Sequence, residues 1–230
     1  MTQPPPAGAP SGAPLEVEAK FRIPDVATFA RLRAVTQLGG LHVGPFTRRA
    51  DDDRYLDTAD GRLLAQGWAC RVRERDGALR ATLKSLAPGH AASAIHSRVE
   101  YETTISAADS TTWPPGDTRD RALALSGGQP LQELFRIHQE RHVAVLRRDA
   151  QPIAELSLDE VHLTGSPPRY GLEAELLPGA TPADLAALCA TLQSDWGLAI
   201  EPESKFEQAW RASGRPLPPP ATGSTHGTAK

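Results

Sequence analysis

The chain has 230 residues, of which 40% are hydrophobic and 23% charged, so it fits one globular domain with a sizeable core and leaves no room for a second large domain. Its net charge of -3 excludes the overall basic excess that is typical of proteins that bind nucleic acid or membrane surfaces. The sequence shows neither an apolar run of about 18 residues nor the basic and apolar regions of a signal peptide, which predicts a cytoplasmic protein.

Both ends of the chain are rich in Pro, Gly, Ala and Ser. Residues 1–14 and 214–230 cannot bury enough apolar surface to order themselves, so we predict two disordered tails around a folded domain of residues 15–213. Cys70 falls in a predicted strand and Cys189 on the apolar face of a predicted helix, and we expect both to be buried thiols.

Helical patterns are few. Asp25 is predicted to cap a helix that runs as far as Leu38, where Gly39-Gly40 marks its end. A second helix is predicted to open at Thr181-Pro182 and to end before Gly197. Residues 203–212 are predicted to form a short helix, and residues 131–140 another.

Most of the remaining chain alternates between apolar and polar residues with a period of two, which is typical of strands. Asp76-Gly77 indicates a hairpin between two of the predicted strands. The predicted strands are residues 15–23, 68–75, 79–85, 97–105, 141–147, 152–162 and 169–177.

The charges in these strands follow the same period. Glu16, Glu18 and Lys20 occupy every second position of the first strand, so their side chains project to one face of it. The pattern recurs in five further strands, at Arg71, Arg73 and Arg75; at Arg80, Thr82 and Lys84; at Arg98, Glu100 and Glu102; at Glu155 and Asp159; and at Glu173 and Glu175.

Such rows of charge can belong to the solvent face of a sandwich or to an interior. Two observations favour an interior: the charges are segregated by sign, and the apolar stripes of the helices must cover the other face of the sheet. We therefore predict an α+β fold, mainly β, built on an antiparallel β-barrel of about eight strands with the helices packed on the outside.

The charges inside the barrel predict the kind of ligand that it binds. Converging Arg and Lys side chains match the oxygens of a chain of phosphates, so triphosphate is the expected ligand. The carboxylates would repel triphosphate unless a hard cation lay between them, so Mg²⁺ or Mn²⁺ is expected as the cofactor.

Several motifs of the sequence resemble those of a known family. Glu16-Val17-Glu18-Ala19-Lys20 looks like the ExExK signature of CYTH domains, the group that includes triphosphate tunnel metalloenzymes, thiamine triphosphatases and class IV adenylyl cyclases. The resemblance extends in order over most of residues 15–211. Its further motifs are Asp53 to Thr58, Arg71 to Arg73, Thr82 to Lys84, Arg98 to Glu102, Phe135-Arg136 with Arg141, Glu155 to Asp159, Glu173 with Glu175, and Ser204 to Phe206.

The resemblance implies an eight-stranded triphosphate tunnel and a role for each matching position. The side chains that would face the phosphates are Lys20, Arg54, Arg71, Arg73, Lys84, Arg136, Arg141 and Lys205. Those that would hold metal, directly or through water, are Glu16, Glu18, Asp159, Glu173 and Glu175, with Glu100 and Glu102 as further candidates. The catalytic centre would consist of Glu16, Glu18, Lys20, Arg54 and Lys84.

Several alternatives stay open at this point. We expect metal-dependent hydrolysis of inorganic triphosphate, with a class IV adenylyl cyclase or a thiamine triphosphatase as rivals inside the family and a polyphosphate- or nucleotide-binding module outside it. A stretch rich in Ala, Gly, Ser and His between Lys84 and Arg98 departs from the family pattern and bears on substrate selectivity. No nucleic acid or membrane is expected as a partner, whereas a homodimer and a CHAD-domain partner in trans are kept open.

Overall fold

The computed structural model describes residues 15–86, 94–163 and 165–214. The tails predicted at 1–14 and 214–230 lie outside these ranges except for Gly214. Residues 87–93, in the middle of the stretch that departs from the family pattern, lie outside them as well.

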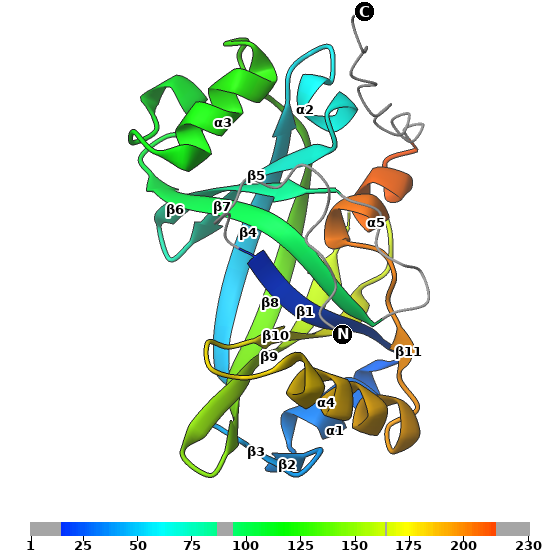
Figure 1. Cartoon of the computed structure of the whole chain (residues 1–230). Helices are drawn as coiled ribbons and strands as arrows, with labels where there is room; N and C mark the ends of the chain where they lie inside the picture. Colours follow the sequence, from blue (N-terminus) through cyan, green and yellow to red (C-terminus); the bar gives the residue numbers. More distant parts are fainter. Residues whose placement is uncertain (1–14, 87–93, 164, 215–230) are drawn as a thin grey trace, which may run out of the picture.

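Eight long antiparallel strands close into a barrel (Figure 1), as the sequence predicts. They are β1 (Leu15–Ile23), β4 (Thr47–Asp57), β5 (Trp68–Arg75), β6 (Ala78–Ser85), β7 (Ile95–Ile105), β8 (Gln132–Arg148), β9 (Gln151–His162) and β10 (Arg169–Leu176). Neighbours follow the order β8-β4-β5-β6-β7-β1-β10-β9, and the ring closes because β9 also pairs with β8. Three short strands extend this sheet: β2 (Gln37–Leu38), β3 (Leu41–Val43) and β11 (Ala199–Ile200).

Helices cover the outside of the barrel in two groups. Helices α1 (Val26–Arg33) and α4 (Pro182–Ser194) pack near β1, β9 and β10, where Phe29, Leu185 and Leu192 join the largest apolar core. The short helix α2 (Arg62–Ala65), the 3-10 turn η1 (Ser110–Thr112) and α3 (Asp117–Ser126) cover another face around Trp113. No helix in the described ranges is both long and apolar enough to cross a membrane.

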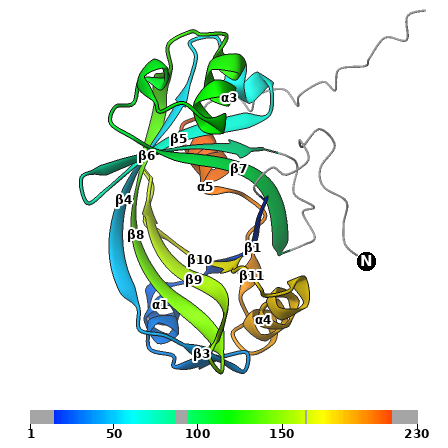
Figure 2. The same cartoon turned by 60° about the vertical axis from the view of Figure 1, so that its left-hand side comes forward.

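The last helix, α5 (Lys205–Ala212), packs against β8, and Figure 2 shows it behind β5 and β7. Its apolar side chains Phe206 and Trp210 are buried together with inward-facing residues of the barrel such as Tyr55 and Ile137. This apolar cluster forms a floor beside the charged part of the barrel interior.

The local turns and caps follow the sequence closely. Asp25 accepts a hydrogen bond from the Thr28 backbone nitrogen at 2.7 Å, and Thr181 forms a capping box at the start of α4. Asp76 and Gly77 both have positive φ, as the two-residue hairpin between β5 and β6 requires. Cys70 and Cys189 are buried free thiols, as predicted.

Two helix predictions are wrong. The first helix ends at Arg33 rather than Leu38, because Leu38 belongs to β2 and pairs with Leu41 of β3. The predicted helix at 131–140 is instead the first half of β8, which begins at Gln132, and its alternate residues Ile137 and Gln139 are buried inside the barrel. Pairing with β4 on one side and β9 on the other outweighs the local propensity of this segment.

The second part of the motif at Asp53 to Thr58 has a structural role. Asp57 is fully buried at the end of β4, and its carboxylate accepts hydrogen bonds from the backbone nitrogens of Leu63 at 2.9 Å and Leu64 at 3.0 Å. It also accepts one from Thr58 at 2.7 Å. Asp57 therefore satisfies the free N–H groups of α2, and the conformation of this corner depends on it.

We predict that Asp57→Ala lowers the free energy of unfolding by about 1–3 kcal/mol, because it leaves buried backbone donors unpaired. Urea unfolding monitored by circular dichroism measures this loss. The exposed Asp120→Ala on α3 is the matched control and should change stability by less than about 0.5 kcal/mol. Equal stability of the two variants would contradict the capping role.

Candidate functional site

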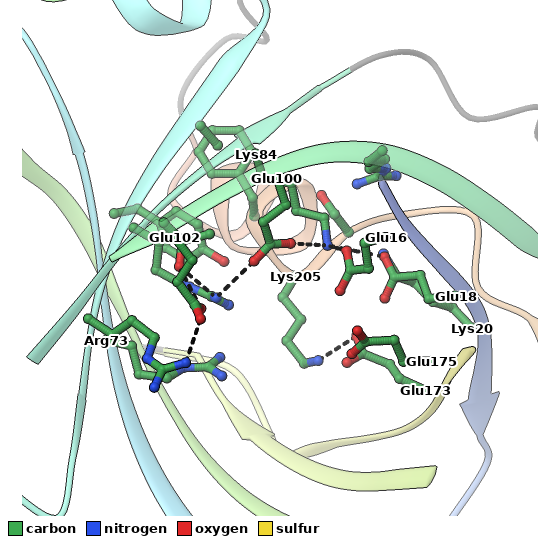
Figure 3. A pocket seen from close by; sticks show the side chains of 18 of the residues that line it. Glu16, Glu18, Lys20, Arg73, Lys84, Glu100, Glu102, Glu173, Glu175 and Lys205 are labelled. Carbon is green, nitrogen blue, oxygen red and sulfur yellow. Dashed lines mark hydrogen bonds and ion pairs between the residues drawn. The ribbon is translucent and has the colours of Figure 1, made fainter. Parts of the chain in front are cut away.

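A cavity of about 520 Å³ lies inside the barrel. Its lining has ten basic and seven acidic side chains, so the site carries a local basic excess although the whole chain is acidic. Figure 3 shows charged side chains from β1, β5, β6, β7, β10 and α5 pointing into this space. The charged lining residues are Glu16, Glu18, Lys20, Arg49, Arg71, Arg73, Arg75, Arg80, Lys84, Arg98, Glu100, Glu102, Arg141, Glu155, Glu173, Glu175 and Lys205.

One side of the cavity is a row of arginines on β5 held by aspartates on β4, and we call it the arginine wall (Arg71, Arg73 and Arg75). Arg73 makes a bidentate pair with the fully buried Asp53, with Nε–Oδ1 at 2.6 Å and Nη2–Oδ2 at 2.8 Å. Arg75 pairs in the same way with Asp51, at 2.5 and 2.8 Å. The guanidinium planes are therefore fixed in position before any ligand arrives.

The opposite side is the acidic wall, which we define as Glu16, Glu18, Glu100 and Glu175. Lys84 from β6 reaches into it and lies 3.3 Å from Glu18 Oε1 and 3.2 Å from Glu100 Oε2, and it also bonds to Glu16. Although burial alone would lower the pKa of Lys84, these carboxylates raise it above its usual value. Lys84 therefore stays a cation in the middle of the wall (Figure 3).

Crowding of negative charge sets the protonation of the acidic wall. Burial and the neighbouring Glu18 raise the pKa of Glu16 to about 8. Burial acts in the same direction on Glu18, but Lys20 and Lys84 outweigh it and lower the pKa of Glu18 to about 2. Burial and the nearby Glu155 raise the pKa of Glu175, which is more open to solvent, to about 7. The wall thus holds more carboxylates than its two lysines neutralise.

Near the α5 floor, four charges form a separate network. Arg141 Nε and Nη2 lie 2.7 and 2.8 Å from the carboxylate of Asp159, and Nη2 also lies 2.6 Å from Glu173. Lys205, from the first turn of α5, lies 2.6 Å from Glu173 and 2.8 Å from Asp159. The capping box of Ser204 orients that turn so that Lys205 enters the cavity.

The structure brings most of the predicted site residues together. Asp159 is fully buried and does not line this cavity, but it pairs with Arg141 and Lys205, which do. The predicted residues that line the cavity are Glu16, Glu18, Lys20, Arg71, Arg73, Lys84, Arg141, Glu173, Glu175 and Lys205, together with the further candidates Glu100 and Glu102.

The predictions for Arg54 and Arg136 are wrong. They are register partners on β4 and β8, and Arg54 also lies opposite Val72, whose side chain belongs to the outer core below α3. Residues opposite each other in register share a face, so both arginines point out of the barrel. Arg136 pairs there with Glu133 at 2.9 Å. Neither residue can face phosphates inside the cavity, and Arg54 is not part of a catalytic centre there.

Strand β4 is also where sequence reasoning missed functional residues. Its inward positions are Arg49, Asp51, Asp53 and Tyr55, which include the two partners of the arginine wall. The charges at every second position, Arg49, Asp51 and Asp53, could have indicated the inward face of β4 in the sequence. The outward Arg48 and Asp52 obscure it, because they put charge on both faces of the same strand.

The donor set of the acidic wall fits a hard divalent cation, since such ions prefer carboxylate oxygens and would relieve the crowding that raises the pKa values of Glu16 and Glu175. Asp159 and Glu173 are less available, because Arg141 and Lys205 already hold them. In the ranges that the structure describes, no three Asp, Glu, His or Cys side chains stand in the arrangement of a metal site. Lys20 and Lys84 instead take the carboxylates as partners.

The chain is therefore a closed antiparallel barrel with both signs of charge inside. A family model described as CYTH domain matches residues 14–208, and the chain belongs to this family. No curated protein matches the sequence.

Solved structures share the fold at low sequence identity. A candidate adenylyl cyclase from Hippeastrum, described as having a dominant triphosphatase activity, is 23% identical, with 88% of this chain and 98% of that chain covered and a TM-score of 0.67. A candidate adenylate cyclase from Bacillus halodurans is 22% identical, with 86% and 98% covered and a TM-score of 0.60. A protein from Pyrococcus horikoshii is 17% identical, with 87% and 99% covered and a TM-score of 0.54.

We predict that Asp53→Ala lowers the free energy of unfolding by about 1–3 kcal/mol, because the buried Arg73 loses its bidentate partner and keeps only Asp51, which lies 3.1 Å from its Nη1. Combining Asp53→Leu with Arg73→Met should recover most of this loss, since the pair then becomes apolar. Chemical unfolding of the single and double variants measures the coupling. Additive losses would show that the pair does not hold the arginine wall in place.

Proposed function

We propose that this protein hydrolyses a phosphoanhydride bond of a triphosphate-containing substrate, with inorganic triphosphate preferred and Mg²⁺ or Mn²⁺ as cofactor. The observation that carries the proposal is the pairing, within one cavity, of a fixed arginine wall with an acidic wall that has excess carboxylates. A module that only bound phosphate could use the basic side chains alone.

Each group of residues has a distinct part in the proposed reaction. Arg71, Arg73 and Arg141 would bind the non-reacting phosphates through the N–H donors that their carboxylate partners leave free. Glu16, Glu18 and Glu175 would hold the cation, which when bound supplies a Lewis acid beside the reacting phosphoryl group. Lys84, which stays protonated between Glu18 and Glu100, would stabilise the charge that develops on the phosphoryl oxygens.

The lining favours inorganic triphosphate over a nucleotide or thiamine triphosphate. Tyr55 and Phe206 are the aromatic residues among the described lining, and their rings pack against each other at 5.3 Å inside the α5 cluster. Neither ring is free to stack a base. The dominant triphosphatase activity of the Hippeastrum protein supports hydrolysis rather than cyclisation. A homodimer, a CHAD-domain partner and a cytoplasmic location stay predictions.

The proposal predicts fast phosphate release from inorganic triphosphate, and slower release from ATP and thiamine triphosphate, in the presence of Mg²⁺ or Mn²⁺. Chelator should stop all release, because the acidic wall then has no cation to bridge it to phosphate. A phosphate-release assay with the three substrates in parallel is the measurement. Tight triphosphate binding without phosphate release from any of the three substrates would contradict hydrolysis and favour a binding module or a cyclase.

We further predict that Glu18→Gln lowers turnover of triphosphate by about 100-fold or more, because it removes a carboxylate of the proposed cation site. Steady-state assays across a range of Mg²⁺ concentrations measure the loss. The control is Glu133→Gln, an exposed carboxylate on the outside of β8, which should leave turnover unchanged. Wild-type activity in Glu18→Gln would remove Glu18 from the site.

A third prediction concerns stability and pH in the presence of chelator. An acid with a raised pKa keeps its proton longer in the folded state than in the unfolded state, so Glu175 costs stability as pH rises from 4.5 to about 7. The stability of Glu175→Gln relative to the wild type should therefore increase with pH across this interval. The difference between the two proteins should stay constant below pH 4.5, and constant at its higher value above about pH 7. Because water in the cavity screens Glu175, we expect only part of the full linkage. Urea unfolding at each pH measures the difference, and parallel curves would contradict the raised pKa.

A further inference from the structure

The outer face of the barrel carries a pair of histidines that the proposed reaction does not use. His138 of β8 and His162 of β9 lie directly opposite each other in the antiparallel register. Their sequence neighbours Ile137 and Val161 are buried in the apolar cluster inside the barrel, so the two histidines point outward. The side chains of His138 and His162 are 62% and 49% exposed. Both imidazoles are therefore open to solvent.

The spacing of this pair suits a single bound ion. Side chains directly opposite each other in an antiparallel sheet have their Cβ atoms about 4.5–5.5 Å apart. Imidazole nitrogens bind a transition metal ion at about 2.0–2.1 Å, so two rings that start this close can reach the same ion. Two histidines at this spacing do not stabilise each other when both are charged, because like charges directly opposite destabilise a sheet.

A carboxylate lies beside one ring nitrogen of each histidine. His138 Nδ1 lies 3.2 Å from Oδ2 of Asp52 on β4, and His162 Nε2 lies 3.2 Å from Oε1 of Glu160 on its own strand. Within the described residues, no hydrogen bond or ion pair occupies Nε2 of His138 or Nδ1 of His162. A metal-ligating histidine usually donates its other N–H to a carboxylate, which fixes the tautomer and makes the ring a better ligand. Each histidine here has such a carboxylate and an unoccupied nitrogen.

Asp52 is placed to orient a ring rather than to bind an ion itself. It is the register partner of His138 between β4 and β8. Its side chain is 28% exposed, and Nε of Arg136 lies 3.7 Å from its Oδ1. That oxygen is buried and has no hydrogen-bond partner in the part of the chain that the structure describes. The carboxylate therefore presents Oδ2 to His138 from within the sheet.

The donor atoms of this pair differ from those of the cavity. The carboxylate oxygens of the acidic wall suit Mg²⁺ or Mn²⁺. Imidazole nitrogens suit borderline ions such as Zn²⁺, Ni²⁺ and Cu²⁺. Two nitrogens leave positions open around the ion, and water can fill them because this face is exposed. A site with two protein ligands is consistent with the absence of a three-residue metal arrangement in the described ranges.

We propose that His138 and His162 bind one borderline divalent metal ion of the Zn²⁺ class on the outer face of β8 and β9. His138 would bind through Nε2 and His162 through Nδ1, while Asp52 and Glu160 orient the two rings. The site is separate from the cavity and does not rest on the proposed function. The ion would link two neighbouring strands and so stabilise the folded state.

The first test titrates the full chain with Zn²⁺ against a colorimetric chelator, with excess Mg²⁺ present to occupy the acidic wall. The wild type should bind Zn²⁺ and unfold at a higher temperature with the ion than without it. His138→Gln and His162→Gln should each weaken Zn²⁺ binding by about 10-fold or more, since even the outer partners of a metal ligand contribute that much. The variant that combines both changes should lose the Zn²⁺-dependent shift in unfolding temperature.

The matched control is His42→Gln, which changes an exposed histidine on β3 and should keep both the Zn²⁺ affinity and the shift. Equal Zn²⁺ affinity of the wild type and the double variant would overturn the site. A wild type that binds no Zn²⁺ would overturn it as well.

The geometry of the site has its own test, because the structure distinguishes the two nitrogens of each ring. Long-range ¹H–¹⁵N NMR spectra should show that Zn²⁺ shifts Nε2 of His138 and Nδ1 of His162. Asp52→Asn should weaken Zn²⁺ binding about 10-fold, whereas the exposed Glu133→Gln on β8 should not. Binding through the opposite nitrogens, or full affinity in Asp52→Asn, would overturn the assigned geometry.

Phosphate release from triphosphate separates this proposal from the proposed function. With Mg²⁺ and without Zn²⁺, the double variant should turn over at the rate of the wild type, because neither histidine is among the described residues that line the cavity. Loss of Zn²⁺ binding with full turnover would support a separate site. Loss of turnover in the same variant would show that the histidines serve the cavity and would overturn that separation. Zn²⁺ binding by a wild type that hydrolyses no triphosphate would keep the site and overturn the proposed function.

Discussion

The structure depends on compensation of charge inside a closed barrel. Closing eight strands into a ring sends every second side chain inward, and in this chain many of those side chains are ionised. A buried charge is tolerated only when a partner or a ligand neutralises it. The aspartates of β4 therefore hold the arginines of β5, and Asp159 with Glu173 holds Arg141 and Lys205.

The same compensation leaves the cavity ready for its ligands. The arginine wall is oriented by paired hydrogen bonds, so little reorganisation of its side chains would be needed to bind the proposed triphosphate substrate. The acidic wall has more carboxylates than lysines to pair with them, and the proposed divalent cation would neutralise this excess.

Much of the fold and site could be predicted because the period of two is a local property. The rows on β1, β5 and β10 reach the cavity as expected, and the hairpin at Asp76-Gly77 fixes the register of β5 with β6. Arg54 was assigned to the site through its motif, yet its position between Asp53 and Tyr55 gives it the opposite face. The β-strand at 132–140 could not be separated from a helix, because its pairing partners are distant in sequence.

The sequence by itself determined most of the barrel strands, the cap of α4, the charged faces of the predicted strands and the family to which the chain belongs. Only the tertiary structure decided which charges meet. Asp53 finds Arg73 twenty residues away, and Lys84 finds Glu16 across a third strand, because the order and register of the ring set these contacts.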